Sequence, residues 1–387
     1  MDFNLSEERR MLTDTAERFI RERYPIEKRH DFAASELGFS RAMWRDFAGL
    51  GLIGALMPPE VDGYGGTGED IMLVFEALGR GLVVEPFLAS GILGASPLID
   101  TGDAQTLGQV MAGERLLALA HGEPDGRYAL SHVRTRATQG AEGWRITGAK
   151  SVVFNGGSAD TMIVSARIAG DADAEDGLAL FRIDPHQQGV ARRGYATIDG
   201  GMAAEITMGG AIGEPVGTPG EAYPMIERAI GRGILAVCAE ALGAMEVAKD
   251  LTLDYLKTRV QFGQPIGANQ VLQHRMVDML IEIEQARSCV MLAASTLDCG
   301  GEADRATRER NLSAAKHLIG RAGRLVAEES IQMHGGVAMT WELALPHYAK
   351  RIVMIDHLFG DTDHHLERFI RFSRGVSDRV APRHARA

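Results

Sequence analysis

Four short stretches of the chain hold residue types that could bind or transform a ligand. Residues 361–365 place two aspartates and two histidines together, and carboxylate and imidazole groups bind metals and move protons. Residues 231–236 match the glycine pattern of dinucleotide-binding loops. Residues 255–263 and 332–336 combine arginine or glutamine with glycine, which suits the binding of a phosphate group. What each stretch does depends on the element that holds it.

The sequence around the first two stretches argues against a metal site in one and a phosphate-binding loop in the other. Adjacent histidines such as His364 and His365 rarely reach the same ion, and no H-x-x-x-H pair accompanies them. We therefore expect no metal site there. The glycine pattern at 231–236 binds a phosphate only when a strand precedes it. A helix-like segment, 225–230, precedes it here, so we interpret the small residues as allowing two helices to approach closely.

The other two stretches leave two interpretations open on physical grounds alone. Arg259 stands near the end of an expected helix and is followed by Phe262 and Gly263. A planar, bidentate cation beside a tight turn suits a phosphate diester, but an arginine and a glycine also simply end helices. In the same way, the glycines at 335–336 let a backbone approach a ligand or form a C-terminal turn.

The elements around these stretches predict an α+β fold with three domains. Residues 1–115 show helical spacing broken by Gly/Pro loops, and residues 116–220 consist of short strand-like runs between Gly, Asp and Asn clusters. From 221 to 387 the helical period returns. Helices, then strands, then helices is not the alternation that builds a parallel sheet.

Particular elements can be predicted within this scheme. Ser6 is a suitable cap for a first helix, and residues 58–66 must interrupt helix. The glycine-rich segment 209–220 is expected to be a loop that connects the second and third domains. Long helices are expected in stretches that lack proline except near an end, namely 266–298, 303–333 and 341–356.

Composition excludes several classes of protein. With 387 residues, 45% hydrophobic and 24% charged, the chain has the profile of a globular protein. A net charge of −11 disfavours nucleic acid and anionic membranes as partners. Cys238, Cys289 and Cys299 form no disulfide framework. Because no signal-like or membrane-spanning apolar run is seen either, we expect a cytoplasmic location.

Taken together and in this order, these motifs resemble the acyl-CoA dehydrogenase family, and the loop at 59–66 strengthens the resemblance. The resemblance implies an FAD flavoprotein with an N-terminal helical domain, a middle β-barrel or β-sandwich domain and a C-terminal four-helix bundle. It also implies a tetramer that oxidises acyl-CoA to 2,3-enoyl-CoA. In such enzymes a carboxylate base removes the α-proton, and the flavin accepts the β-hydride.

The sequence departs from the family at both positions known for that base. The glutamate of the family's turn after the penultimate helix corresponds to Gly360, and the alternative position corresponds to Gly233. Two carboxylates could substitute. Asp361 is the next residue along, although it also suits a helix cap. Glu240 lies about 10 Å from Gly233 along a helix, although it also suits a structural or interface role.

The expected flavin pocket is altered as well. Where the family has a Gly-Ser-Asp segment that holds the flavin and its pyrophosphate, residues 121–128 contain no serine. Where the family has Trp-Ile-Thr against the flavin ring, this chain has residues 152–154, Val-Val-Phe. Thr362 alone remains at a position that contacts the flavin in the family.

The family's contacts with the adenosine diphosphate half of FAD, in contrast, are retained. In the family these residues reach across an interface to a neighbouring subunit's cofactor. They correspond here to Arg259, Phe262, Gln270, Gln332 and Gly336.

The contacts with the adenosine diphosphate half of FAD are retained, whereas those with the flavin ring and the base are altered. This contrast suggests a subunit that supports a flavin without performing the chemistry itself. The chain is similar to the small, non-catalytic subunit of pimeloyl-CoA dehydrogenase and of steroid side-chain dehydrogenases, which implies a partner of the same family in an α2β2 tetramer. Two alternatives use Asp361 as the base: a homotetrameric acyl-CoA dehydrogenase, and a flavoenzyme like nitroalkane oxidase. A scaffold without flavin is a further alternative, and the retention of Arg259, Gln332 and Gly336 argues against it.

Overall fold

The computed structural model describes residues 5–141, 143–298 and 302–380. The chain forms two compact units. One comprises Met1–Gly66 and Val83–Gly233, and the other comprises Thr67–Leu82 and Ile234–Ala387. Cys299 lies outside the described residues, whereas Cys238 and Cys289 are free thiols.

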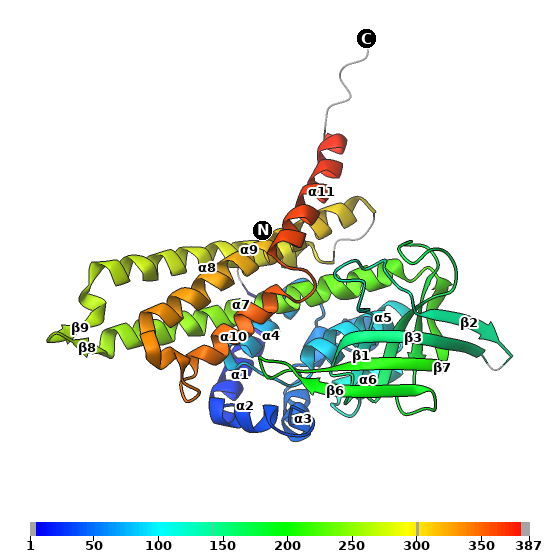
Figure 1. The fold of residues 1–387 in the computed structure, drawn as a ribbon, viewed down its shortest axis with the longest axis horizontal. Helices are drawn as coiled ribbons and strands as arrows, with labels where there is room; N and C mark the ends of the chain where they lie inside the picture. Colours follow the sequence, from blue (N-terminus) through cyan, green and yellow to red (C-terminus); the bar gives the residue numbers. More distant parts are fainter. Residues whose placement is uncertain (1–4, 142, 299–301, 381–387) are drawn as a thin grey trace, which may run out of the picture. The chain divides into compact units, whose positions relative to one another are not determined.

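The first unit begins with short helices, drawn in blue and cyan in Figure 1. The α-helices are α1 (Glu7–Arg23), α2 (Ile26–Ala33), α3 (Arg41–Gly49), α5 (Ala95–Thr101) and α6 (Ala104–Met111). Between them lie two 3₁₀ turns, Gly54–Leu56 and Pro59–Val61, and a π-helix, Phe87–Gly94. The expected cap of α1 is confirmed, because the Ser6 side chain accepts a hydrogen bond from the Arg9 N–H at 3.3 Å.

The glycines of the 59–66 loop are required by close backbone contacts. A Cβ atom on Gly63 would lie 2.2 Å from the carbonyl oxygen of Met57, and one on Gly65 would lie 2.2 Å from that of Ala55. Gly66 also has a φ of 83°, which favours glycine. The loop therefore folds back tightly on the turn that precedes it.

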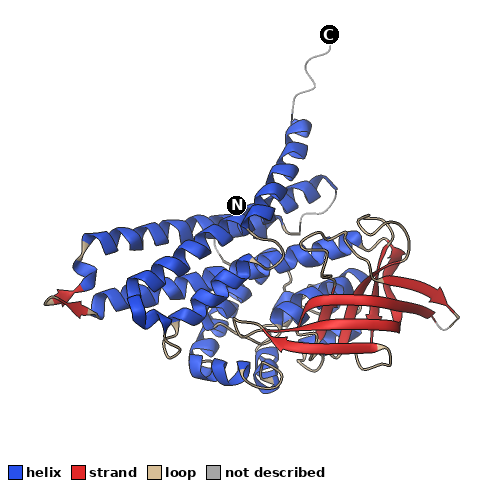
Figure 2. Ribbon diagram, in the orientation of Figure 1, coloured by secondary structure: helices blue, strands red, loops and turns tan. Residues whose placement is uncertain are grey.

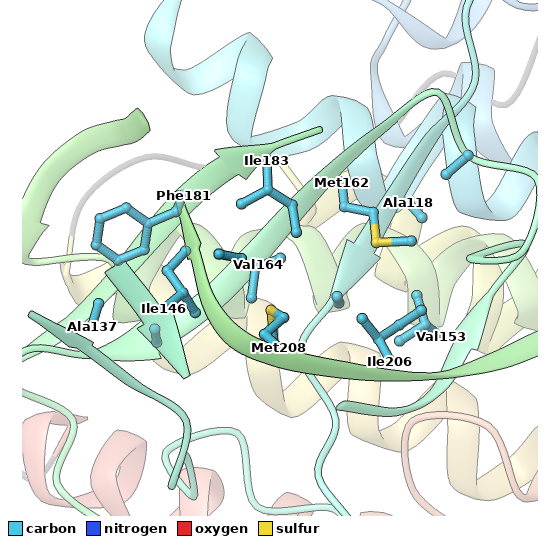
Figure 3. Packing of buried hydrophobic residues seen from close by; sticks show 14 of the residues in the cluster. Ala118, Ala137, Ile146, Val153, Met162, Val164, Phe181, Ile183, Ile206 and Met208 are labelled. Atoms are coloured by element: carbon cyan, nitrogen blue, oxygen red, sulfur yellow. The ribbon is translucent and has the colours of Figure 1, made fainter. Parts of the chain in front are cut away.

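The same unit contains a seven-stranded mixed sheet, which Figure 2 shows in red. Its strands are β1 (Leu117–Ala120), β2 (Arg136–Gly140), β3 (Gly143–Phe154), β4 (Thr161–Arg167), β5 (Leu178–Ile183), β6 (Val190–Ala196) and β7 (Met202–Gly220). The pairings β4–β2, β2–β3, β3–β7, β7–β5 and β5–β4 close on themselves, as in a barrel. Figure 3 shows the apolar interior, where Ile146, Phe181 and Met208 are fully or almost fully buried.

The expectation that 209–220 is a connecting loop is wrong. These residues form the second half of β7, which pairs with β3 and then with β5. A glycine-rich segment was expected to be irregular, but its partners β3 and β5 are distant in sequence and supply the hydrogen bonds that keep it extended.

The second unit is helical. It contains α4 (Gly68–Gly81), most of α7 (Tyr223–Thr258), α8 (Gln270–Thr296), α9 (Glu302–His334), α10 (Leu345–Asp356) and α11 (Thr362–Val380). A small hairpin, β8 (Val260–Gln261) and β9 (Gln264–Pro265), joins α7 to α8, and α9 packs against α8, α10 and α11. The expected α+β class, with helical ends and a central β region, is confirmed.

Glycine lets α4 approach α7 closely. A Cβ atom on Gly243 would lie 2.0 Å from the carbonyl oxygen of Glu76, and one on Gly79 would lie 2.0 Å from that of Glu240. Residues 231–236 lie inside α7, so they do not form a strand-to-helix phosphate loop. None of the helices in the described parts of the chain is both long and apolar enough to cross a membrane.

Candidate functional site

The turn between α10 and α11 contains Gly360, which the sequence predicts to correspond to the position of the family's base. Phe359 and Gly360 adopt positive φ angles of 60° and 118°. Both of their carbonyl groups are bound by side chains of this chain. His365 Nε2 lies 3.1 Å from the Phe359 oxygen, and Lys316 Nζ donates to the Gly360 oxygen at 2.7 Å. The turn is thus fixed through its backbone.

A side chain at position 360 would clash with two histidine rings in this turn. A Cβ atom built on Gly360 would lie 2.5 Å from His364 Cδ2 and 2.7 Å from His365 Nε2. Real Cβ atoms essentially never approach other heavy atoms below 3.0 Å. Because His365 is fully buried and its ring nitrogen is bonded to Phe359, the imidazole has little room to move away. A side chain at position 360 would therefore require the histidine rings to shift.

Two buried basic side chains surround the turn, and burial weakens their affinity for protons. Lys316 also donates to the Asp356 carbonyl oxygen at 2.8 Å. Burial lowers the pKa of Lys316, while Cys238, Asp356 and Asp361 oppose this change. Burial lowers the pKa of His365 to about 2, and the nearby charge of Lys316 adds to the effect. His365 is therefore neutral at physiological pH.

Asp361 and Thr362 both make hydrogen bonds within the chain. Asp361 Oδ1 accepts the His364 N–H at 2.9 Å, which makes Asp361 a cap at the start of α11. Thr362 Oγ1 donates to Asp356 Oδ1 at 2.8 Å. Among residues 5–141, 143–298 and 302–380, no three His, Cys, Asp or Glu side chains gather as metal ligands would.

Glu240, the second candidate base, is held in an ion pair. Arg351 on α10 donates from Nε to Glu240 Oε1 at 2.6 Å and from Nη2 to Oε2 at 2.7 Å. Both carboxylate oxygens of this buried residue are thus engaged in a bidentate contact. On the same helix α10, Tyr348 donates to the Arg80 carbonyl oxygen at 2.5 Å. These contacts fix α10, which leads into the turn.

The two motifs assigned to the ADP half of FAD lie together in the second unit. The Tyr255 ring stacks on His334 with centroids 4.4 Å apart, which joins the end of α7 to the end of α9. Arg259 is exposed where α7 ends, and Phe262, at the tip of the β8–β9 hairpin, is 102% exposed with a φ of 52°. The sequence did not indicate this stacking, because Tyr255 and His334 lie in two motifs that are far apart along the chain.

The remaining predicted residues of this group are also exposed. Gln270 begins α8, and Gln332 lies in the last turn of α9. Gly335 and Gly336 have no atom within 4 Å of a built Cβ position, so the space beside this backbone is open. Exposed arginine and glutamine side chains and an open glycine backbone are groups of the kind that bind phosphates, so these residues fit the adenosine diphosphate half of FAD in their chemistry.

The β region presents a different surface at the positions assigned to the flavin ring. Val152 has a φ of 52° and is 50% exposed, an unusual conformation for a β-branched residue. Neither its side chain nor that of Phe154 has a hydrogen-bond donor. The residues present at 152–154 therefore do not fit the ring half of FAD as the family's Trp-Ile-Thr segment would.

The same β region contains a buried network, centred on Lys150, that the sequence did not reveal. Lys150 Nζ donates to Glu123 Oε1 at 2.8 Å, to the His121 carbonyl oxygen at 3.1 Å and to Ser165 Oγ at 3.0 Å. Burial lowers the pKa of Lys150 to about 8, although Glu123 opposes this. Burial likewise lowers the pKa of His121 to about 3, and the charge of Lys150 contributes. Glu123 also accepts the N–H groups of Arg134 and Thr135, so the network holds residues 121–135 in place.

Two family models match the chain. The acyl-CoA dehydrogenase N-terminal domain matches residues 6–111, and the acyl-CoA dehydrogenase C-terminal domain matches residues 223–373. The chain belongs to the acyl-CoA dehydrogenase family. This membership confirms the expected class of oxidoreductase, which acts on acyl-CoA.

Individual relatives agree with this assignment. The chain is 28% identical to acyl-CoA dehydrogenase IpdE2 of Mycolicibacterium smegmatis over 94% of this chain and 98% of the relative. Among solved structures, the ChsE4-ChsE5 complex from Mycobacterium tuberculosis matches with a TM-score of 0.84 at 24% identity, over 98% of this chain and 99% of the matched chain. An FAD complex of PigA matches with a TM-score of 0.87 at 24% identity, over 97% of this chain and all (100%) of the matched chain.

Proposed function

We propose that this chain is the FAD-supporting subunit of a heteromeric acyl-CoA dehydrogenase and that the catalytic base belongs to a partner of the same family. One observation carries the proposal. Gly360 stands at the usual position of the base, and its surroundings leave no space for a Cβ atom. The second position of the base, Gly233, is also glycine. General-base catalysis typically contributes about 10²- to 10⁴-fold to a rate, so a chain without the base is a poor catalyst.

The contrast between the two halves of the cofactor supports the same proposal. Arg259, Phe262, Gln270, Gln332 and Gly336 offer an exposed surface for the adenosine diphosphate half of FAD. Residues 152–154 lack the groups for the ring half. When bound, FAD supplies the acceptor for the substrate hydride. In this proposal Arg259 binds a phosphate oxygen of a partner's FAD, and Gln332 and the open backbone at Gly336 orient the cofactor.

The comparisons suggest the type of partner. A structure of similar fold is described as a complex of two differently named proteins, ChsE4 and ChsE5. By analogy we propose an α2β2 tetramer in the cytoplasm that acts on acyl-CoA substrates from fatty acid or steroid side-chain degradation. We further propose that the chain consists of three domains, residues 1–115, 116–220 and 221–387.

A second candidate keeps catalysis in this chain with Asp361 as the base. Asp361 adjoins the usual position of the base and is only partly buried. Against it, one carboxylate oxygen already caps α11 through the His364 N–H. The same residue would serve a chemistry like that of nitroalkane oxidase. In either case Thr362 would contact the flavin of its own chain.

The test compares turnover by the purified chain alone with turnover by the complex isolated from its host, using a panel of acyl-CoA thioesters. We expect dehydrogenation by the complex and none above background by the chain alone. In the complex, Asp361→Asn should retain turnover, whereas Arg259→Ala should lose bound FAD. Ordinary enzymatic rates from the chain alone, abolished by Asp361→Asn, would overturn the proposal and make Asp361 the base.

A further inference from the structure

A buried carboxyl group joins three elements of the first unit. Glu85, 5% exposed, lies just before Pro86 and the π-helix Phe87–Gly94. Its Oε2 accepts the Tyr24 hydroxyl at 2.7 Å, and its Oε1 accepts the Ser40 N–H at 3.3 Å. The Tyr24 hydroxyl in turn accepts the Val84 N–H at 3.1 Å. The carboxyl group thus ties the end of α1 and the start of α3 to the segment that enters the π-helix.

Aromatic side chains enclose this contact and continue onto the π-helix. The Tyr24 ring lies 5.6 Å from Phe32 and 6.2 Å from Phe47, measured between centroids. Phe47 also contacts Phe87, the first residue of the π-helix, at 5.3 Å. Trp44 packs edge-on against Phe87 at 5.0 Å. Packed rings thus connect Tyr24, the partner of Glu85, to the first residue of the π-helix.

Few charges face the carboxyl group. Tyr24 comes from α1, and Arg29 from α2 acts on Tyr24 through its positive charge. The buried Arg29 guanidinium donates to the Asp199 carbonyl oxygen in the turn between β6 and β7. From α3 the contact is the backbone N–H of Ser40. An ionised carboxylate here relies on neutral donors alone, namely the Tyr24 hydroxyl, the Ser40 N–H and its own backbone N–H, which compensate only in part for lost hydration.

We propose that Glu85 is a proton-controlled latch on the π-helix Phe87–Gly94, which is held firmly while Glu85 is protonated and loosened when Glu85 ionises. A π-helix is rare and often found at functional sites. The segment that enters this one is held by the Glu85 contacts with Tyr24 and Ser40. Burial raises the pKa of Glu85 to about 7, although the hydrogen bonds from Tyr24 and Ser40 oppose this.

Whether a rise in pH weakens or strengthens the latch depends on how the pKa of Glu85 in the folded protein compares with its ordinary value. The pKa of Glu85 in the folded state lies above its ordinary value of 4.5. The stabilising effect of the bound proton is therefore complete below 4.5 and is lost as the pH rises through about 7. Above that value the latch is weakest.

Hydrogen exchange of the full-length protein tests the latch. Backbone amides of 83–94 are compared about one pH unit below and one above the pKa of Glu85, with the intrinsic exchange rates removed. Coupling to a single proton predicts protection factors about tenfold lower at the higher pH. Trp44 fluorescence should follow the same titration.

Three variants make the test specific. Glu85→Gln keeps the shape of the side chain but cannot ionise, so its protection factors should not change with pH. Tyr24→Phe removes a donor to the carboxylate and should move the midpoint to higher pH. Glu60→Gln changes an exposed carboxylate and should behave as wild type. Equal pH dependence in wild type and Glu85→Gln, or none in wild type, would overturn the proposal.

Discussion

Replacing Gly360 with alanine measures how strictly the α10–α11 turn excludes a side chain. The residue has a φ of 118°, and the new Cβ would lie 2.5 Å from His364 Cδ2 and 2.7 Å from His365 Nε2. A non-glycine residue in such a conformation costs about 1–3 kcal/mol. Forcing a methyl group into packed surroundings costs about 1–3 kcal/mol more. We therefore expect Gly360→Ala to lower the free energy of unfolding by about 2–6 kcal/mol.

The assay is urea-induced unfolding of the purified protein, followed by circular dichroism. Gly335→Ala is the matched control, because Gly335 has a φ of 69° but no atom within 4 Å of its built Cβ. It should show the cost of a positive φ without a steric clash, and at a φ of 69° that cost is smaller than at Gly360. His365→Ala removes one of the two clashing rings. In that background, Gly360→Ala should destabilise the protein less than it does in wild type. If Gly360→Ala destabilises the protein no more than Gly335→Ala, the steric argument is refuted.

The same geometry determines what Gly360→Glu can achieve. A glutamate begins with the same Cβ atom, so it meets the same two imidazole rings. We expect this variant to be destabilised and to gain no dehydrogenase activity. A folded Gly360→Glu protein with new turnover would show that the turn accommodates a base after all.

Three further results are expected. Glu240→Gln removes the carboxylate that pairs with the mostly buried Arg351, and it should lower the free energy of unfolding in urea by about 3 kcal/mol. The double replacement Glu240→Leu/Arg351→Met should recover most of that loss. If Glu240→Gln has no effect, Glu240 is not held in a structural ion pair. Burial tends to raise the pKa of Glu123, but Lys150 outweighs burial and lowers the pKa to about 2. The stability that ionised Glu123 contributes should therefore be complete above pH 4.5 and lost as the pH falls toward 2. Chemical denaturation of wild type and Glu123→Gln across this range checks it, since their difference should shrink with acid. Arg259→Ala should reduce the ratio of flavin to protein in the isolated complex, measured by absorbance, whereas Arg324→Ala on the exposed face of α9 should not.

Local signals in the sequence predict much of the fold. Ser6 caps α1 as expected, and the stretches poor in proline became α8, α9 and α10. The order of helical and strand-like segments gave the α+β class. These features depend on neighbours a few residues apart, which a single sequence records directly.

Contacts between distant segments explain what the sequence did not reveal. Residues 209–220 look like a loop until β3 and β5 pair with them. Glu240 could be considered as a base because nothing in the sequence indicates that Arg351, more than a hundred positions away, holds it. Nor does a glycine at 360 reveal that His365 fills the space beside it.

Native mass spectrometry of the complex isolated from its own host tests the central claim most directly, by counting chains and FAD together. The proposal predicts a heterotetramer of this chain with a second acyl-CoA dehydrogenase family member, containing one FAD for every two chains. A homotetramer with one FAD for each chain would contradict it and would return Asp361 to the role of catalytic base.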